Sequence, residues 1–223
     1  MGSRNKLKRF AAVKTFTNVF EFTEHMAGRW NTEYFHNDHP ITVELGCGKG
    51  EYALGLARQH PDNNYIGADI KAERIYIGAK QALADHVSNV AFLRILIDGL
   101  AAYFAPGEID ELWITFPDPF PREKQAKHRL TSPRFLAMYH QLLRPGGQLH
   151  LKTDALNLFN YSLDTVAEAG ADVLTACVNI YDQPELSHPA LALKTNFENK
   201  HLAIGRSIHY VCAQWPLTNT YEK

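Results

Sequence analysis

The chain has 223 residues, of which 45% are hydrophobic and 21% charged, and its formal net charge is −1. This length suits one ordinary domain with a full core, and the near-neutral charge excludes a generally basic nucleic-acid-binding coat. No apolar run approaches the roughly 18 residues that cross a membrane. Cys47, Cys177 and Cys212 have no paired spacing, which argues against a disulfide framework or a zinc motif and predicts a cytoplasmic protein without a metal.

Residues 1–39 are predicted to form a polar, aromatic and partly helical extension, in which Phe20, Phe22 and Met26 share one face of a helix. Its basic residues are Arg4, Lys6, Lys8, Arg9 and Lys14. Two interpretations remain open for this segment, a solvated extension and a basic arm that contacts nucleic-acid phosphate.

Alternating strands and helices are predicted from residue 40 to residue 217, followed by a tail over 218–223. The strands are expected at 41–45, 64–69, 90–97, 111–115, 147–153, 171–178 and 208–214. The helices are expected at 51–59, 72–85, 133–143 and 156–169. This order predicts a mainly parallel seven-stranded sheet with helices on both faces. No long helix separates the last two strands, which predicts an antiparallel hairpin at the sheet edge.

A glycine-rich loop follows the strand at 41–45, where ligands bind in sheets of this kind. Gly46 and Gly48 permit unusual φ angles and close approach of a ligand to the backbone. A dinucleotide fingerprint requires a third glycine where Glu51 stands, which disfavours a dehydrogenase. The carboxylate of Glu44 beside the loop suits a positively charged ligand, such as the sulfonium and ammonium groups of S-adenosylmethionine.

Acidic residues also follow the next two predicted strands. Asp69 is placed to accept hydrogen bonds from ribose hydroxyls, and Asp98 is placed to face an adenine amino group. A single acid at such a position is more often a cap, but Glu44, Asp69 and Asp98 together predict a nucleoside cofactor. Cys47 is interpreted as a small loop residue, not a nucleophile, because no histidine lies nearby in sequence.

The loop at 116–121 reads Phe-Pro-Asp-Pro-Phe-Pro and follows the strand at 111–115. Its prolines restrict the backbone, so Asp118 is a candidate catalytic residue on a rigid platform. A basic segment comes next, over residues 122–129. It is either a solvated surface loop or a contact for RNA phosphate beside the active site.

These residues resemble the bacterial tRNA (guanine-N7)-methyltransferases, a similarity that runs from about Lys6 to Gln214. The loop at 116–121 is the most specific motif, supported by Leu-Lys-Thr-Asp at 151–154 and Thr-Asn-Phe-Glu at 195–198. The resemblance implies a Rossmann-like class I methyltransferase fold with S-adenosylmethionine as cofactor. It also implies transfer of a methyl group to N7 of guanine 46 in the variable loop of tRNA.

The resemblance further implies roles for individual residues. The implied cofactor contacts are Glu44, Gly46, Gly48, Asp69, Asp98 and Asp118. The implied guanine or tRNA contacts are Arg122, Asp154, Thr195, Asn196, Phe197 and Glu198. The family usually has tryptophan at Phe120 and lysine at Arg122, and its basic segment is denser, which affects the expected strength of tRNA binding.

Guanine N7 has an in-plane lone pair and no proton, so catalysis is expected to rest on alignment and electrostatics. Asp118, Asp154 and Glu198 are candidates to stabilise the positive charge on the product and to accept hydrogen bonds from guanine. Three alternatives remain: a methyltransferase for rRNA or a small molecule, a non-catalytic RNA-binding subunit, and the disfavoured dehydrogenase. A monomer or weak homo-oligomer is expected, with tRNA as partner and no membrane attachment.

Overall fold

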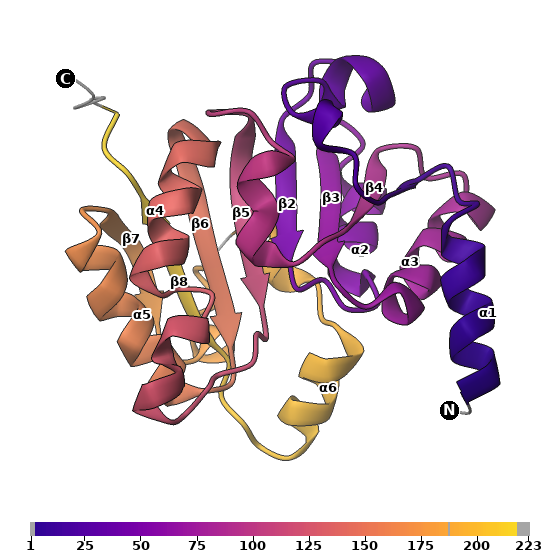
Figure 1. Ribbon diagram of the computed structural model, residues 1–223. Coiled ribbons are helices and arrows are strands. Elements are labelled where there is room, and N and C mark those ends of the chain that lie inside the picture. Colours follow the sequence, from indigo (N-terminus) through magenta and orange to yellow (C-terminus); the bar gives the residue numbers. More distant parts are fainter. Residues whose placement is uncertain (1–2, 187, 218–223) are drawn as a thin grey trace. The chain divides into compact units, whose positions relative to one another are not determined.

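The computed structural model describes residues 3–186 and 188–217 (Figure 1). The tail predicted over 218–223 lies outside these residues. The chain forms two compact units, Met1–Ala105 and Pro106–Lys223, which are described separately. The predicted domain boundaries at residues 39 and 217 stay predictions.

Parallel strands form the sheet of the first unit. They are β1 (Val19–Phe20), β2 (Ile41–Leu45), β3 (Asn64–Asp69) and β4 (Val90–Arg94). β4 pairs with both β1 and β3, and β3 pairs with β2. Every residue of β2 and β3 is buried, because strands of a parallel sheet are covered on both faces. The two-residue strand β1 is the one strand that the sequence did not predict.

Three α-helices belong to the first unit: α1 (Ser3–Val13), α2 (Glu51–Gln59) and α3 (Ala72–Ala84). Shorter helical segments are η1 (Glu24–Met26), η2 (Trp30–Phe35) and η3 (Ile97–Ala102). The bounds of α2 and α3 agree with the prediction to within one residue. Helix α1 contacts α3, and Lys6 lies 3.6 Å from Glu73 across that contact.

The segment before β2 differs from the sequence prediction. Phe20 lies in β1 and Phe22 has a φ of 54°, so neither shares a helical face with Met26. The indole of Trp30 is fully buried and donates a hydrogen bond of 2.8 Å to the carbonyl of Tyr103. This aromatic part of the predicted extension therefore contributes to the core of the first unit.

The second unit contains a mixed sheet of β5 (Ile109–Thr115), β6 (Leu143–Thr153), β7 (Asp172–Cys177) and β8 (His209–Gln214). β5 and β6 are parallel, whereas β8 is antiparallel to both β6 and β7. The predicted antiparallel C-terminal strands are therefore confirmed, and β8 lies between β6 and β7.

Three α-helices belong to the second unit: α4 (Pro133–Leu142), α5 (Leu156–Glu168) and α6 (Asn196–Ala203). Shorter segments are η4 (Glu123–His128), η5 (Ile180–Asp182) and η6 (Pro189–Ala192). Helix α5 packs on β6, β7 and β8 and contacts α4. Figure 1 shows α6 beyond the ends of β5 and β6. No helix within residues 3–186 and 188–217 has the length and apolar character needed to cross a bilayer.

Candidate active site

The glycine-rich loop of the first unit joins β2 to α2 through three left-handed residues. Gly46, Gly48 and Gly50 have φ angles of 74°, 56° and 70°, a region that other residues rarely adopt. The backbone N–H groups of Gly46 and Cys47 donate to the carbonyl of Ala68 at 2.8 and 3.0 Å. A Cβ added to Gly46 would meet no atom within 4 Å, so this side of the loop is open.

The opposite side of the same loop packs tightly on α3 and β4. A Cβ added to Gly78 of α3 would lie 2.4 Å from the carbonyl oxygen of Lys49. A Cβ added to Gly50 would lie 2.3 Å from a ring atom of Phe92. These contacts leave no room for a side chain at Gly50 or Gly78, and they fix the position of the loop against α3 and β4.

Glu44 and Asp69 are both buried and hold the backbone around the loop. Glu44 accepts a hydrogen bond of 3.0 Å from the N–H of Ala53 in α2. Asp69 accepts one of 2.9 Å from the N–H of Gly48 and one of 2.8 Å from the N–H of Lys71. The two carboxylates thus concentrate negative charge at the carboxyl ends of two paired strands, where a cationic ligand is favoured.

Burial and the negative charge of Glu44 and Asp69 disfavour ionisation of the Cys47 thiol. Burial, reinforced by the charges of Glu44 and Asp69, raises the pKa of Cys47 well above its ordinary value. A thiol that keeps its proton is a poor nucleophile, which agrees with the interpretation of Cys47 as a loop residue. Asp98, the third predicted acid, is exposed in the first turn of η3.

In the second unit, the loop that carries Asp118 is conformationally strained. Phe116 and Phe120 have φ angles of 48° and 42°, which are unusual for residues with a bulky side chain. Arg129 is buried and donates hydrogen bonds of 3.0 to 3.2 Å to the carbonyls of Pro119 and Phe120. Asp118 itself is exposed between these fixed ends.

The basic segment therefore contains two kinds of cation. Arg129 is buried, supports the loop and lies over the ring of Tyr161 at 4.2 Å. Arg122, Lys124 and Lys127 are exposed on or beside η4 and stay predicted RNA contacts.

Asp154 follows β6 and faces two basic side chains. Its Oδ2 lies 2.7 Å from Nδ1 of His201 and accepts a hydrogen bond from Arg206. The ring of Phe197 stacks on His201 at 4.0 Å and contacts Phe116 at 5.1 Å. Asp154 and the exposed ring of Phe197 thus lie beside one another at the carboxyl end of β6.

The motif at 195–198 divides between structural and exposed positions. Thr195 caps α6, because its hydroxyl accepts a hydrogen bond of 3.1 Å from the N–H of Glu198. Asn196 and Phe197 are exposed. Glu198 is fully buried and lies 2.8 Å from Nζ of Lys152. The predicted contact of Glu198 with guanine stays a prediction.

The sequence predicted no structural role for four residues that organise these side chains: Arg129, Lys152, Tyr181 and Arg206. The burial of Lys152 leaves no local signal, because Gln148, His150 and Lys152 alternate with leucines in the strand at 147–153, a pattern that predicts an exposed polar face. The partners of Arg129 and Arg206 are loop atoms and an acid far away in sequence, which no local pattern reveals.

A second cluster in this unit contains Glu111, His150 and His188, each with an atom within 4.8 Å of the others. Nε2 of His188 lies 3.9 Å from Glu111, and its Nδ1 accepts a hydrogen bond from the N–H of Ala190. A neutral ring then carries its proton on Nε2, which removes that atom as a metal ligand. His150 stacks on Trp113 at 4.1 Å. The cluster is therefore best described as aromatic and hydrogen-bonded packing.

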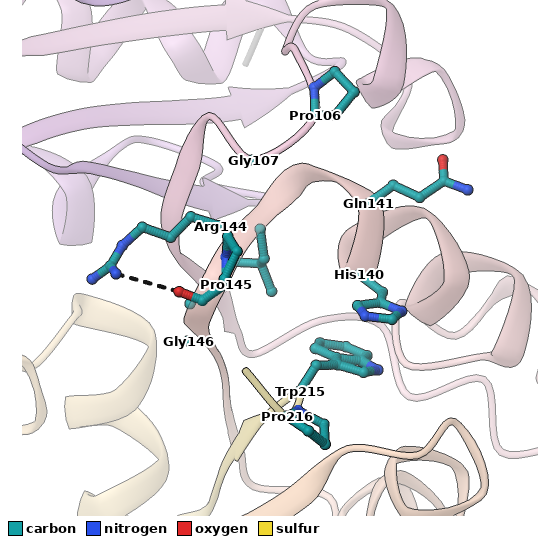
Figure 2. A pocket seen from close by; sticks show the side chains of 11 residues that line it. Pro106, Gly107, His140, Gln141, Arg144, Pro145, Gly146, Trp215 and Pro216 are labelled. Atoms are coloured by element: carbon teal, nitrogen blue, oxygen red, sulfur yellow. Dashed lines mark hydrogen bonds between the residues drawn. The ribbon is translucent and has the colours of Figure 1, made fainter. Parts of the chain in front are cut away.

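A pocket of about 380 Å³ lies at the other end of β5 and β6. Figure 2 shows it between the segment at 144–147, His140 and Trp215, with Arg144 donating to the carbonyl of Pro145. The rings of His140 and Trp215 stack at 5.1 Å. None of the predicted site residues lines this pocket.

Three comparisons place these features in a family. Residues 38–211 match a family described as "Putative methyltransferase". The tRNA (guanine-N(7)-)-methyltransferase of Christiangramia forsetii is 43% identical over 95% of this chain and 98% of its own length. The enzyme of the same name from Porphyromonas gingivalis is 42% identical over 89% of this chain and 85% of its own length.

Solved structures support the fold alone. The 16S rRNA methyltransferase KamB has a TM-score of 0.62 at 15% identity and covers 85% of this chain and 92% of its own. The [4+2]-cyclase SpnF has a TM-score of 0.56 at 17% identity and covers 87% of this chain and 82% of its own. Because a cyclase shares the architecture, the fold does not determine the reaction. The sequence identities do determine the family: this chain belongs to the tRNA (guanine-N7)-methyltransferases.

Proposed function

We propose that this protein transfers the methyl group of S-adenosylmethionine to N7 of a guanine in tRNA, at position 46 of the variable loop. The observation that carries the proposal is the similarity to relatives named for this reaction, which reaches 43% identity over 95% of the chain. The loop motif around Asp118 and the acidic strand ends supply the chemistry that the reaction needs.

The first unit suits a cationic nucleoside ligand. The open side of Gly46 leaves space above the loop, and the buried carboxylates of Glu44 and Asp69 supply negative charge beside it. Asp69 retains acceptor capacity for ribose hydroxyls, because each carboxylate oxygen has two lone pairs. When bound, S-adenosylmethionine supplies an electrophilic methyl group on a sulfonium.

The second unit suits a purine and a phosphate backbone. Asp118 and Asp154 are acceptors at the carboxyl ends of β5 and β6, and Phe197 offers an exposed ring for stacking. Guanine presents N1–H and amino donors to such acceptors, whereas adenine lacks the N1–H. Exposed Arg122, Lys124 and Lys127 supply cations for tRNA phosphate.

No general base is needed, because N7 carries a lone pair and no proton. The residues therefore act by holding the base and by stabilising the positive charge that develops on it. Arg129 binds the carbonyls of Pro119 and Phe120, which restricts the loop that carries Asp118.

The test is methyl transfer from S-adenosylmethionine to unmodified tRNA transcript, with N7-methylguanosine mapped by borohydride and aniline cleavage. The wild-type protein is expected to modify guanine 46. Asp118→Asn is expected to lower turnover by about 100-fold, whereas Asp69→Asn is expected mainly to weaken donor binding. Asp62→Asn, an exposed acid in the turn before β3, is the matched control.

Two results would refute the proposal. The first is an unmodified tRNA together with methylation of rRNA or of a small molecule. The second is wild-type turnover in Asp118→Asn, Asp154→Asn and Glu198→Gln alike. Absence of donor binding in calorimetry would instead favour a non-catalytic RNA-binding subunit.

A further inference from the structure

Lys152 is the most unusual charged residue of the second unit. It lies near the end of β6 with no exposed side-chain surface, although a buried ammonium loses its hydration. Burial lowers the pKa of Lys152, and the charge of Glu198 opposes this shift. Such a residue is kept in a core only if its partners compensate it fully.

Three partners of Lys152 belong to α6 or to the segment that leads into it. Its Nζ lies 2.8 Å from Oε2 of Glu198 and donates to the carbonyls of Leu193 and Leu191 at 3.2 and 3.5 Å. A single strand residue thus binds both the chain before α6 and the first turn of that helix.

The other carboxylate oxygen of Glu198 has a partner in a different element. The hydroxyl of Tyr181 in η5 donates a hydrogen bond of 2.6 Å to Oε1 of Glu198. Lys194 lies over the ring of Tyr181 at 4.5 Å. Glu198 is therefore fixed between β6 and η5, and it has no exposed surface.

Fixing Glu198 also fixes its exposed neighbours. Thr195 caps the same turn, and Asn196 and Phe197 extend from it toward solvent. We propose that Lys152 is a positioning residue for the predicted guanine contacts of the second unit, which acts through the Glu198 carboxylate to hold the first turn of α6 in place. This inference rests on the proposed function, because the groups that it positions are predicted guanine contacts.

The test compares Lys152→Met with wild type in tRNA methylation and in donor binding by calorimetry. The donor dissociation constant is expected to stay within about 2-fold, since the glycine-rich loop belongs to the first unit, while turnover falls by about 10- to 100-fold. Without the ammonium, Glu198 loses the partner that ties the first turn of α6 to β6, so the loss should appear in turnover and in tRNA binding but not in donor binding.

Three further variants sharpen the test. Lys80→Met removes an exposed charge from α3, outside this cluster, and is expected to keep wild-type turnover. Lys152→Arg keeps the charge and is expected to recover part of the turnover that Lys152→Met loses. The double variant Lys152→Met/Glu198→Gln buries neither charge, so it is expected to fold even if Lys152→Met alone fails to fold. Its turnover is expected to equal that of Glu198→Gln.

Wild-type turnover in Lys152→Met would overturn the inference. So would a further loss in the double variant relative to Glu198→Gln, because Lys152 would then act through another group. Failure of the proposed function is a different result, namely wild-type protein that leaves tRNA unmethylated. In that case coupling between Lys152 and Glu198 in urea unfolding still decides whether the pair fixes α6.

Discussion

Arg129 shows how one side chain determines the geometry of a loop. Its guanidinium donates three hydrogen bonds to the carbonyls of Pro119 and Phe120. A planar fork serves several acceptors at once, whereas a lysine ammonium is a point charge on a flexible stem. The loop that carries Asp118 therefore depends on an arginine outside the motif itself.

Replacing Arg129 by Lys is expected to lower the free energy of unfolding by about 1–3 kcal/mol, because the carbonyls of Pro119 and Phe120 lose part of their charged donors. Urea denaturation of the purified protein measures this change. Arg122→Lys is the matched control: this residue is exposed, and its substitution should change stability by less than about 0.5 kcal/mol. Equal stability of the two variants would contradict the assigned role of Arg129.

His150 makes stability depend on pH. Burial, with a contribution from His188, holds the pKa of His150 well below its ordinary value of 6.5. The groups that face it are His188, Glu111 and Tyr210. The unfolded chain therefore binds a proton that the folded chain excludes, and stability falls as the pH drops below 6.5.

The expected loss from His150 is about 1.4 kcal/mol per pH unit below that value. Urea midpoints between pH 7.5 and 5 measure it. His150→Phe keeps a ring against Trp113 and is expected to flatten the dependence, whereas His25→Gln, an exposed histidine, should not. An equal slope in His150→Phe and wild type would exclude His150 as the source.

Among the elements, helix α3 fixes the position of the glycine-rich loop. Gly78 of α3 lies directly against the carbonyl of Lys49, with no space for a Cβ. Helix propensity alone favours alanine over glycine by about 1 kcal/mol. The backbone contact opposes that gain, because a carbonyl cannot rotate away as a flexible side chain does.

Gly78→Ala is accordingly expected to destabilise the protein by about 1–3 kcal/mol and to weaken donor binding, since the loop must shift. Thermal unfolding and calorimetry measure the two effects. Gly99→Ala is the control for stability, because its added Cβ meets no atom within 4 Å. If Gly78→Ala were more stable than wild type, the loop would accommodate the added Cβ without loss of stability, which would contradict this prediction.

The element predictions succeeded where periodicity is strong. The bounds of β2, β3 and α2 were predicted to the residue, because buried strands and amphipathic helices leave clear local patterns. Helices α1 and α6 were not assigned. Helix α6 has few buried residues and is stabilised by the Thr195 cap and by the Lys152–Glu198 pair, so hydrophobic periodicity does not reveal it.

At the scale of the whole molecule, the net charge of −1 contrasts with a polyanionic substrate. Binding of tRNA must then use local cations, and affinity should fall with salt as counterions are released. Exposed Arg122, Lys124 and Lys127 are the predicted source in the second unit.

Replacing these three cations by Ala is expected to reduce the slope of log K against log salt by about 2, at roughly 0.7–0.9 per lost phosphate contact. Filter binding between 50 and 200 mM salt, the range in which such slopes are about linear, measures it. Arg144→Ala, at the opposite end of β6, should leave the slope unchanged. An unchanged slope in the triple variant would assign tRNA binding to other cations, such as those of α1.

Local patterns along the chain predicted seven strands and four helices in the right order, the glycine-rich loop with its acidic strand ends, and the family resemblance. These features are local or are carried by contiguous motifs, so they can be read along the chain. Which charged residues are exposed could be learned only from the folded structure. Arg129 and Glu198 look like solvent-facing site residues in the sequence, yet both are buried. Their partners are far away in sequence, and the cost of burying a charge depends on those partners.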